Sequence, residues 1–156
     1  MKTNETKQIE RMIFDIFNDK YGRGQTVVLE CQIGDWYKDI RLGIVDAIAY
    51  NQTKDEFLCF EIKTSVADFR SKAKKTFVGN RNYYAMPIDV YEKVKNEIPK
   101  DIGCYVLEQS KSCLDFYRFY CVKKCKPKQL EVSKELLLAN MLRSARNKTN
   151  LEYVEI

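Results

Sequence analysis

The chain has 156 residues, of which 45% are hydrophobic and 31% are charged, and its formal net charge is +5. This length and composition predict a single folded domain over residues 1–156 and argue against a disordered tail or a miniprotein. No run approaches the ~20 consecutive apolar residues that span a bilayer, and the first residues lack the apolar core of a signal peptide. We therefore expect a cytoplasmic protein with no membrane partner.

The charge is unevenly distributed along the chain. Residues 1–62 carry a net charge of −3, residues 63–81 carry +5, and residues 111–148 carry +7. Two basic blocks beside acidic positions suit a protein that holds a phosphate backbone against a cluster of carboxylates. Charge runs on solvated faces would give the same pattern, so charge alone does not decide between these readings.

The six cysteines mostly lie inside apolar, strand-like runs, where a reduced thiol behaves as a small buried hydrophobe. Cys121 and Cys125 are close enough in sequence to contribute to a metal site. However, the chain has no histidine and no Cys-x-x-Cys motif, so a zinc or iron–sulfur site is the weaker interpretation.

The first half of the chain predicts a helix followed by three strands and a second helix. Apolar residues at helical spacing indicate an amphipathic helix over 5–20, ending before Gly22 and Gly24. The polar stretch 51–56 is typical of a hairpin loop. The predicted strands are 26–32, 44–50 and 57–64. Ser65-Val-Ala-Asp68 fits a helix-capping signature, so a helix should start at Ser65 and carry Phe69, Arg70, Lys72, Lys74 and Lys75.

The second half predicts a strand, a helix, a hairpin and a final helix. A short apolar run over 83–86 ends at Pro87, and residues 88–98 read as a helix stopped by Pro99. Strands over 103–108 and 113–122 are joined by a polar turn, and the last helix spans about 133–147. This order predicts an α/β (α+β) domain, with a central mixed β-sheet flanked by helices and with a C-terminal β-hairpin and helix.

The predicted hairpin over 44–64 brings three ionisable side chains together. If its strands pair symmetrically about the loop, Asp46 lies directly opposite Glu61, and cross-strand partners point to the same face. Lys63 shares the Glu61 face because side chains alternate along a strand. Ile44, Ile48 and Cys59 would surround this cluster.

This grouping of charges suits phosphodiester hydrolysis. Carboxylate oxygens of Asp46 and Glu61 can hold Mg²⁺ or Mn²⁺, with the backbone carbonyl of Ile62 as a further ligand. Lys63 would orient the attacking water and offset charge that develops on the phosphate. An ordinary surface salt-bridge pattern on a hairpin would look the same from spacing alone.

The residues Val45-Asp46, a gap, and Glu61-Ile-Lys63 resemble the core motif of the PD-(D/E)XK nucleases, with Val45 in place of the proline. The longer run from Glu61 to Arg70 resembles the MmcB-like group of DNA repair nucleases and related phage and prophage proteins. The stretches 82–87 and 98–103 and the closing basic helix at 138–146 are similar to that group as well. The resemblance covers about residues 41–148.

The resemblance implies a restriction-endonuclease-like αβββαβ core with its active site facing DNA. It also implies a further carboxylate from the first helix, for which Glu10 is the best-placed candidate, although a solvated helix acid would look the same. This chain departs from the family pattern after Arg70, where Ser71-Lys-Ala-Lys-Lys75 replaces the usual residues. That departure leaves the contribution of the second helix open.

Several other residues have a functional and a structural interpretation. Glu30 is a strand acid that would lie near the hairpin, and Asp68 is explained by helix capping as well as by the family motif. Lys72, Lys74, Lys75 and Arg81 follow the active strand closely enough to contact DNA phosphates. Residues 117–128 interleave aromatic and basic side chains, which fits either base stacking or ordinary cross-strand packing.

Together these features predict a Mg²⁺- or Mn²⁺-dependent deoxyribonuclease that acts in DNA repair, recombination or phage DNA processing. The alternatives are a DNA-binding or protein-binding module that keeps the fold without cleaving, and a phage protein that acts on a host complex. A branch-resolving enzyme would need two active sites and hence a homodimer.

Overall fold

The structure is a computed structural model of the chain that describes residues 1–19, 24–113 and 116–153. Within these residues the helices are α1 (Asn4–Phe17), α2 (Val66–Arg70), α3 (Ile88–Val94) and α4 (Lys134–Tyr153), with 3-10 turns at Trp36–Lys38 and Lys95–Glu97. The strands are β1 (Gln25–Asp35), β2 (Ile40–Asn51), β3 (Glu56–Ile62), β4 (Arg81–Pro87), β5 (Gly103–Gln109) and β6 (Tyr117–Lys123). The predicted order of elements is confirmed.

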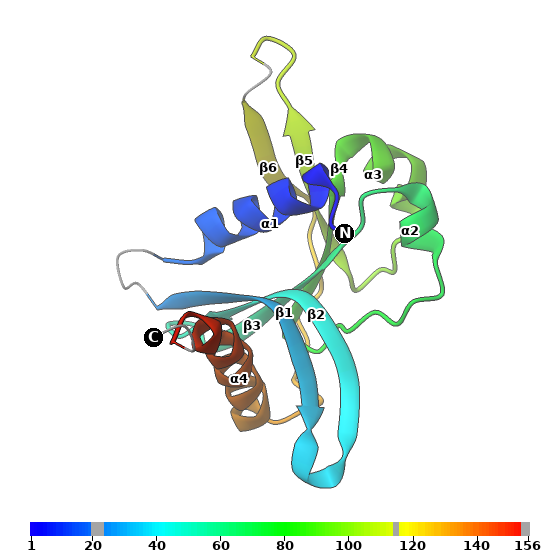
Figure 1. Cartoon of the computed structure of the whole chain (residues 1–156). Coiled ribbons are helices and arrows are strands. Elements are labelled where there is room, and N and C mark those ends of the chain that lie inside the picture. The colour runs from blue at the N-terminus through cyan, green and yellow to red at the C-terminus, as the bar shows by residue number, and fades with distance from the viewer. Residues whose placement is uncertain (20–23, 114–115, 154–156) are drawn as a thin grey trace.

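One mixed sheet organises the fold (Figure 1), with strand order β1-β2-β3-β4-β5-β6. Strands β3, β4 and β5 are parallel, and the other neighbours are antiparallel. Parallel neighbours need a crossover connection, and α2 and α3 lie in the two crossovers. The predicted α+β domain with a mixed sheet flanked by helices is therefore correct. None of the described helices is long and apolar enough to span a bilayer.

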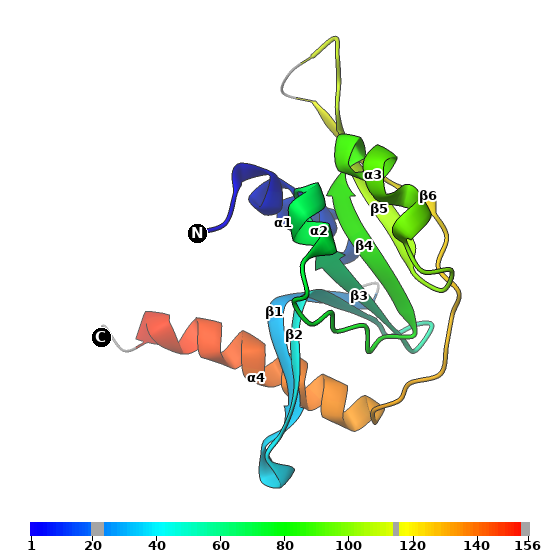
Figure 2. The same cartoon turned by 90° about the vertical axis from the view of Figure 1, so that its right-hand side faces the viewer.

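Helices cover both faces of the sheet. Ile9 and Ile13 of α1 pack with Phe60, Ile62 and other residues on one face. On the other face, Leu137 and Met141 of α4 pack against β1, β2 and β3. Helices α2 and α3 cover the parallel strands on that same face, as the view from the side shows (Figure 2).

Strands β1 and β2 bend at Glu30 and Asp46. Val28 and Cys31 pack into the same cluster although three residues apart, and Val45 and Ile48 do likewise. In a regular strand, two residues three positions apart point to opposite faces of the sheet. The alternation of side chains is therefore interrupted at Glu30 in β1 and at Asp46 in β2. The two strands keep their register across the bend, and Glu30 adopts a left-handed φ of 50°. The bend places both acids where the hairpin leaves the sheet.

Helix α2 is shorter than predicted. It begins after its N-cap Ser65, as the capping signature indicates, but ends at Arg70, and Ser71 is already extended. The expectation that this helix carries Lys72, Lys74 and Lys75 is wrong, since these lysines lie on an extended stretch. We call residues 71–80 the basic segment.

The basic segment is extended because it must cross closely over β2. Thr76 is buried, and a Cβ at Gly43 of β2 would lie 2.3 Å from its Oγ1. At the end of the segment, the Asn82 side chain bonds to both the N–H and the carbonyl of Gly79. These contacts satisfy backbone groups without a helix.

The remaining predictions differ from the structure mainly at element ends. Helix α1 stops at Phe17, and α3 stops at Val94 and continues as a 3-10 turn. Part of the last predicted hairpin, residues 114 and 115, lies outside the described residues, as does Gly22. Of the cysteines, Cys31, Cys59 and Cys104 are buried as expected, whereas Cys113 and Cys121 are exposed.

Candidate active site

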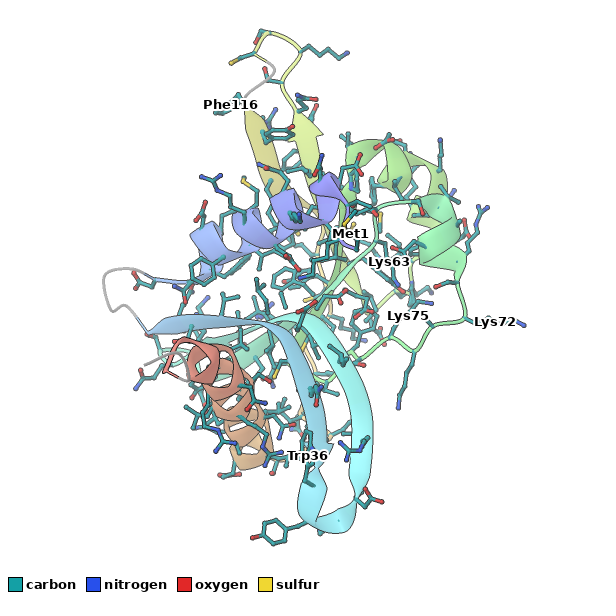
Figure 3. All side chains as sticks on the ribbon, in the orientation of Figure 1. Met1, Trp36, Lys63, Lys72, Lys75 and Phe116 are labelled. Carbon is teal, nitrogen blue, oxygen red and sulfur yellow. The ribbon has the colours of Figure 1, made fainter. Side chains whose placement is uncertain are left out.

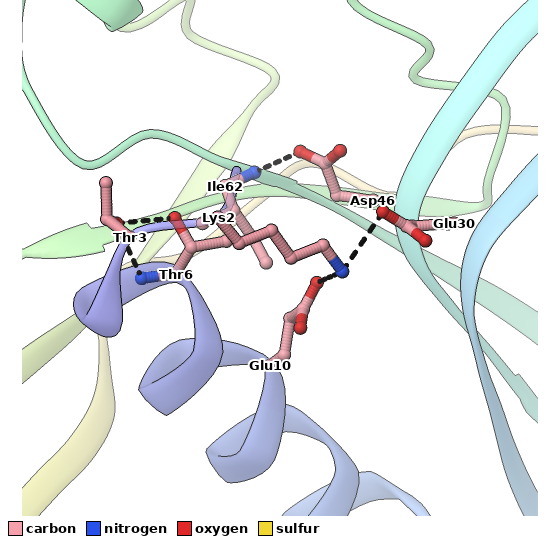
Figure 4. A network of polar contacts seen from close by, with 7 residues as sticks. All are labelled: Lys2, Thr3, Thr6, Glu10, Glu30, Asp46 and Ile62. Atoms are coloured by element: carbon pink, nitrogen blue, oxygen red, sulfur yellow. Dashed lines mark hydrogen bonds and ion pairs between the residues drawn. The ribbon is translucent and has the colours of Figure 1, made fainter.

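The β2–β3 hairpin has the predicted register, which brings Asp46 next to the end of β3. Pairing runs from Asn51 with Glu56 to Ala47 with Phe60 and stops there. One step further, Asp46 does not pair through its backbone with Glu61. Instead its Oδ2 accepts a hydrogen bond of 2.7 Å from the Ile62 N–H (Figure 4). The Asp46 carboxylate thus takes the place of the backbone carbonyl that would accept the next hydrogen bond between β2 and β3.

Glu61 is a buried carboxyl, with only 6% of the residue exposed. Burial and then the nearby Asp46 raise its pKa to about 7, although Lys63, a hydrogen bond from the Thr76 backbone and Lys75 act in the opposite direction. Its Oε2 is buried without a hydrogen-bond partner among the described residues. Such an oxygen is costly unless a ligand, water or ion satisfies it.

Asp46 belongs to the same electrostatic cluster. Burial raises the pKa of Asp46 most strongly, and the Ile62 N–H and Lys63 lower it. Asp68 and Glu10 also raise the pKa of Asp46, so both acids lie within its electrostatic reach. Asp46 raises the pKa of Glu61, and Lys63 lowers the pKa of both carboxyls, so the three predicted side chains lie within electrostatic reach of one another.

Lys63 is buried as well, with 5% of the residue exposed. Its backbone N–H donates to the Ala85 carbonyl of β4, which fixes its position just beyond β3. Its ammonium Nζ lies 3.6 Å from Asp68 Oδ1. A buried ammonium is stable only beside carboxylates, and here it lowers the pKa of both Asp46 and Glu61.

Asp68 links the capping motif to this cluster. Its backbone N–H donates to the Ser65 hydroxyl, and its own Oδ2 accepts weakly from Thr64 N–H at 3.4 Å. The predicted cap by Ser65 is therefore present, whereas the Asp68 carboxylate contacts the N–H of Thr64 rather than that of Ser65. The ion pair with Lys63 shows that the same carboxylate also faces the candidate site.

Glu10 and Glu30 form a second acidic pair, bridged by an ammonium. Lys2 bonds to Glu10 and lies 3.0 Å from Glu30 Oε1, so its Nζ stands between them (Figure 4). Glu10 is 9% exposed and is not the solvated helix acid that its sequence position also allowed. Sequence reasoning missed Lys2, because nothing in the first residues indicates that they fold back to this point.

The acids do not form a ready cage of three ligands. Among the described residues, no three His, Cys, Asp or Glu side chains are grouped closely enough to hold a metal ion. The predicted set of Asp46, Glu61 and the Ile62 carbonyl has two side chains only. Both carboxyl groups have a raised pKa, and Glu61 has an oxygen without a hydrogen-bond partner among the described residues. Two such carboxylates suit a hard divalent cation that keeps several of its water ligands.

The predicted phosphate-binding residues separate into two groups. Lys75 lies close enough to Glu61 to lower its pKa, and Lys72 and Lys74 are exposed on the same basic segment. Figure 3 shows Lys63 and Lys75 between α2 and β2, with Lys72 pointing outward. Arg81 lies elsewhere: it pairs with Glu56 at 3.0 Å, beside Leu58 rather than Glu61.

Comparison of the chain with protein-family models, with curated proteins and with solved structures gives no match. The resemblance to the MmcB-like group therefore rests on the motifs in the sequence.

Proposed function

We propose that this protein is a Mg²⁺- or Mn²⁺-dependent deoxyribonuclease with a PD-(D/E)XK-type active site. The observation that carries the proposal is the buried, unsatisfied Glu61 carboxylate beside Asp46 and Lys63 at the end of β3. The order α1, β1-β2-β3, α2, β4 supports it, because it matches the αβββαβ core implied by the motifs.

Each residue of the site would have a distinct role. Asp46 and Glu61, with the Ile62 carbonyl, would hold the cation, whose chemistry is to bind the scissile phosphate and to lower the pKa of a water. Lys63 would orient that water and offset charge on the phosphate. The Lys63 ammonium lies 3.6 Å from Asp68 Oδ1, and we assign Lys63 an electrostatic role rather than that of a base.

Glu10 would act at the edge of this site. It influences Asp46 electrostatically, and Lys2 currently neutralises it. Glu10 would therefore be the further carboxylate from the first helix, next to Asp46. Lys72, Lys74 and Lys75 would hold the phosphates next to the scissile one, where they release counterions.

The test is cleavage of linear, nicked and branched DNA by the purified protein with Mg²⁺ or Mn²⁺. Asp46→Asn, Glu61→Gln and Lys63→Ala should each lose activity while keeping the fold. Glu56→Gln is the matched control, since it removes an acid from the same strand at the end remote from Glu61. Full activity in Glu61→Gln would remove this assignment.

A second candidate function is a DNA-binding or protein-binding module that keeps the fold without cleaving. Two observations favour it: the absence of a three-ligand group among the described side chains, and the Lys2 ammonium between Glu10 and Glu30. Retained DNA binding by the wild type with no cleavage of any substrate would support the module.

A further inference from the structure

A cavity of about 610 Å³ opens beside the candidate active site, between α2, the basic segment and the loop after α3. Its aromatic wall comes from three elements: Phe69 of α2, Phe77 of the basic segment and Tyr84 of β4. This volume lies within the usual range of small-ligand pockets, about 300–1,000 Å³.

The Tyr84 ring contacts both phenylalanine rings, tilted against Phe69 and edge to face with Phe77. The Tyr84 ring centroid lies 5.0 Å from that of Phe69 and 5.2 Å from that of Phe77, which is perpendicular to it. Phe69 and Tyr84 are buried, whereas Phe77 is only half-buried. Phe77 is therefore the most accessible of the three rings that line the cavity.

The cavity and the carboxylates share a wall. Tyr84 is the cross-strand neighbour of Glu61, and burial and then the nearby Glu61 raise the pKa of Tyr84 to about 12. Lys75 lines the cavity and also acts on Glu61. A phosphate held by Lys63 and by a cation at Glu61 would thus lie beside an aromatic pocket that Lys75 also lines.

The rim of the cavity is charged. Arg70 makes two hydrogen bonds to Glu97, at 3.0 and 2.8 Å, which fix the plane of its guanidinium. A fixed guanidinium plane can stack on a base, and lysine beside it attracts phosphate.

We propose that this cavity binds the unpaired base of the nucleotide next to the scissile phosphate, stacked on Phe77. The proposal deepens the nuclease function and rests on it: the substrate class would be nucleic acid that is single-stranded at the cleavage point. A base inside a duplex must first leave the stack to enter such a pocket, at an energetic cost. Stacking on an aromatic ring tolerates any base, so no sequence preference follows.

The proposal is tested by binding in EDTA, where no cation supports cleavage. The probes are a fluorescein-labelled 12-residue oligothymidylate and a labelled 12-base-pair duplex, compared by fluorescence anisotropy. Phe77→Ala and Phe77→Leu should both bind the single strand about 5- to 30-fold more weakly and the duplex within twofold of wild type. Leucine keeps apolar bulk, so Phe77→Leu separates the loss of the ring from a loss of packing.

A second measurement needs only the wild-type protein. A single strand carrying one 2-aminopurine should change its fluorescence on binding, because the base exchanges its stacked neighbours for an aromatic side chain, and the same base within a duplex should not. Unchanged single-strand affinity in Phe77→Leu, or an unchanged 2-aminopurine signal in the bound single strand, would refute the pocket.

The two proposals fail in different ways. Phe77-dependent binding of single strands without cleavage in Mg²⁺ or Mn²⁺ would leave the pocket in place and refute the nuclease. Cleavage of duplex and single strand alike, with affinities independent of Phe77, would support the nuclease and refute the pocket.

Discussion

Replacing Glu61 by glutamine should stabilise the metal-free protein at neutral pH. The pKa of Glu61 rises from 4.5 to about 7 on folding, because the carboxyl is buried next to Asp46. The folded state therefore binds a proton that the unfolded state has released between pH 4.5 and 7, and the free energy of unfolding falls as the pH rises through this window. Each pKa unit corresponds to about 1.4 kcal/mol, so the loss approaches roughly 3 kcal/mol by pH 7.

Glutamine mimics the protonated carboxyl and escapes this loss. At pH 8 we expect the free energy of unfolding of Glu61→Gln to exceed that of wild type by about 1–3 kcal/mol. At pH 4.5 the wild-type carboxyl is itself protonated in the folded state, so the two proteins should differ little. The gain stays below the full loss because an amide group needs hydrogen-bond partners that the site lacks for Oε2. The assay is urea denaturation followed by circular dichroism at both pH values in EDTA. An equal difference between the two proteins at pH 4.5 and pH 8 would refute the reasoning, since only a titrating group makes the difference depend on pH.

Three further outcomes are expected. Asp46→Asn should lose at least about 100-fold in cleavage rate but keep its melting temperature, since an amide oxygen can still accept from the Ile62 N–H. Asp46→Ala leaves that N–H unpaired, so its free energy of unfolding should fall by roughly 1–3 kcal/mol more. Equal melting temperatures of the two variants would contradict this. Mn²⁺ affinity, measured by calorimetry, should rise roughly tenfold per pH unit below pH 7 and level off above it, because the cation competes with the proton on Glu61; a flat profile would argue against Glu61 as a ligand. Substituting glutamine for all three lysines of the basic segment should reduce the slope of log affinity against log salt by about 2 for single strands, and an unchanged slope would remove the segment from the DNA interface.

The hairpin could be predicted from the sequence because its determinants are local. The polar loop at 51–56 fixes the β2–β3 register, and Ser65 and Asp68 form the cap that their spacing indicates. These features depend on residues close together in the chain. The same reasoning located Asp46 beside Glu61, although it missed that Asp46 bonds to the Ile62 backbone.

What could not be predicted depends on contacts between distant residues. The sequence gives no sign that Lys2 folds back onto Glu10 and Glu30. The slip of side-chain alternation at Glu30 needs a left-handed backbone that glutamate rarely adopts. The aromatic cavity joins Phe69, Phe77 and Tyr84 from three elements, so no single segment carries its pattern.

The crossing of the basic segment over Gly43 connects the proposed DNA-binding lysines to the β1–β2 hairpin. Gly43 has a φ of +136°, and any side chain there would collide with Thr76. The Thr76 backbone N–H donates a hydrogen bond to the Glu61 carboxyl. Thr76 therefore links the β2 backbone to Glu61, the proposed metal ligand, and to neighbouring Lys75. Alanine at position 43 would displace Thr76 and so weaken the phosphate and cation binding that we propose for these residues, although position 43 itself belongs to neither set.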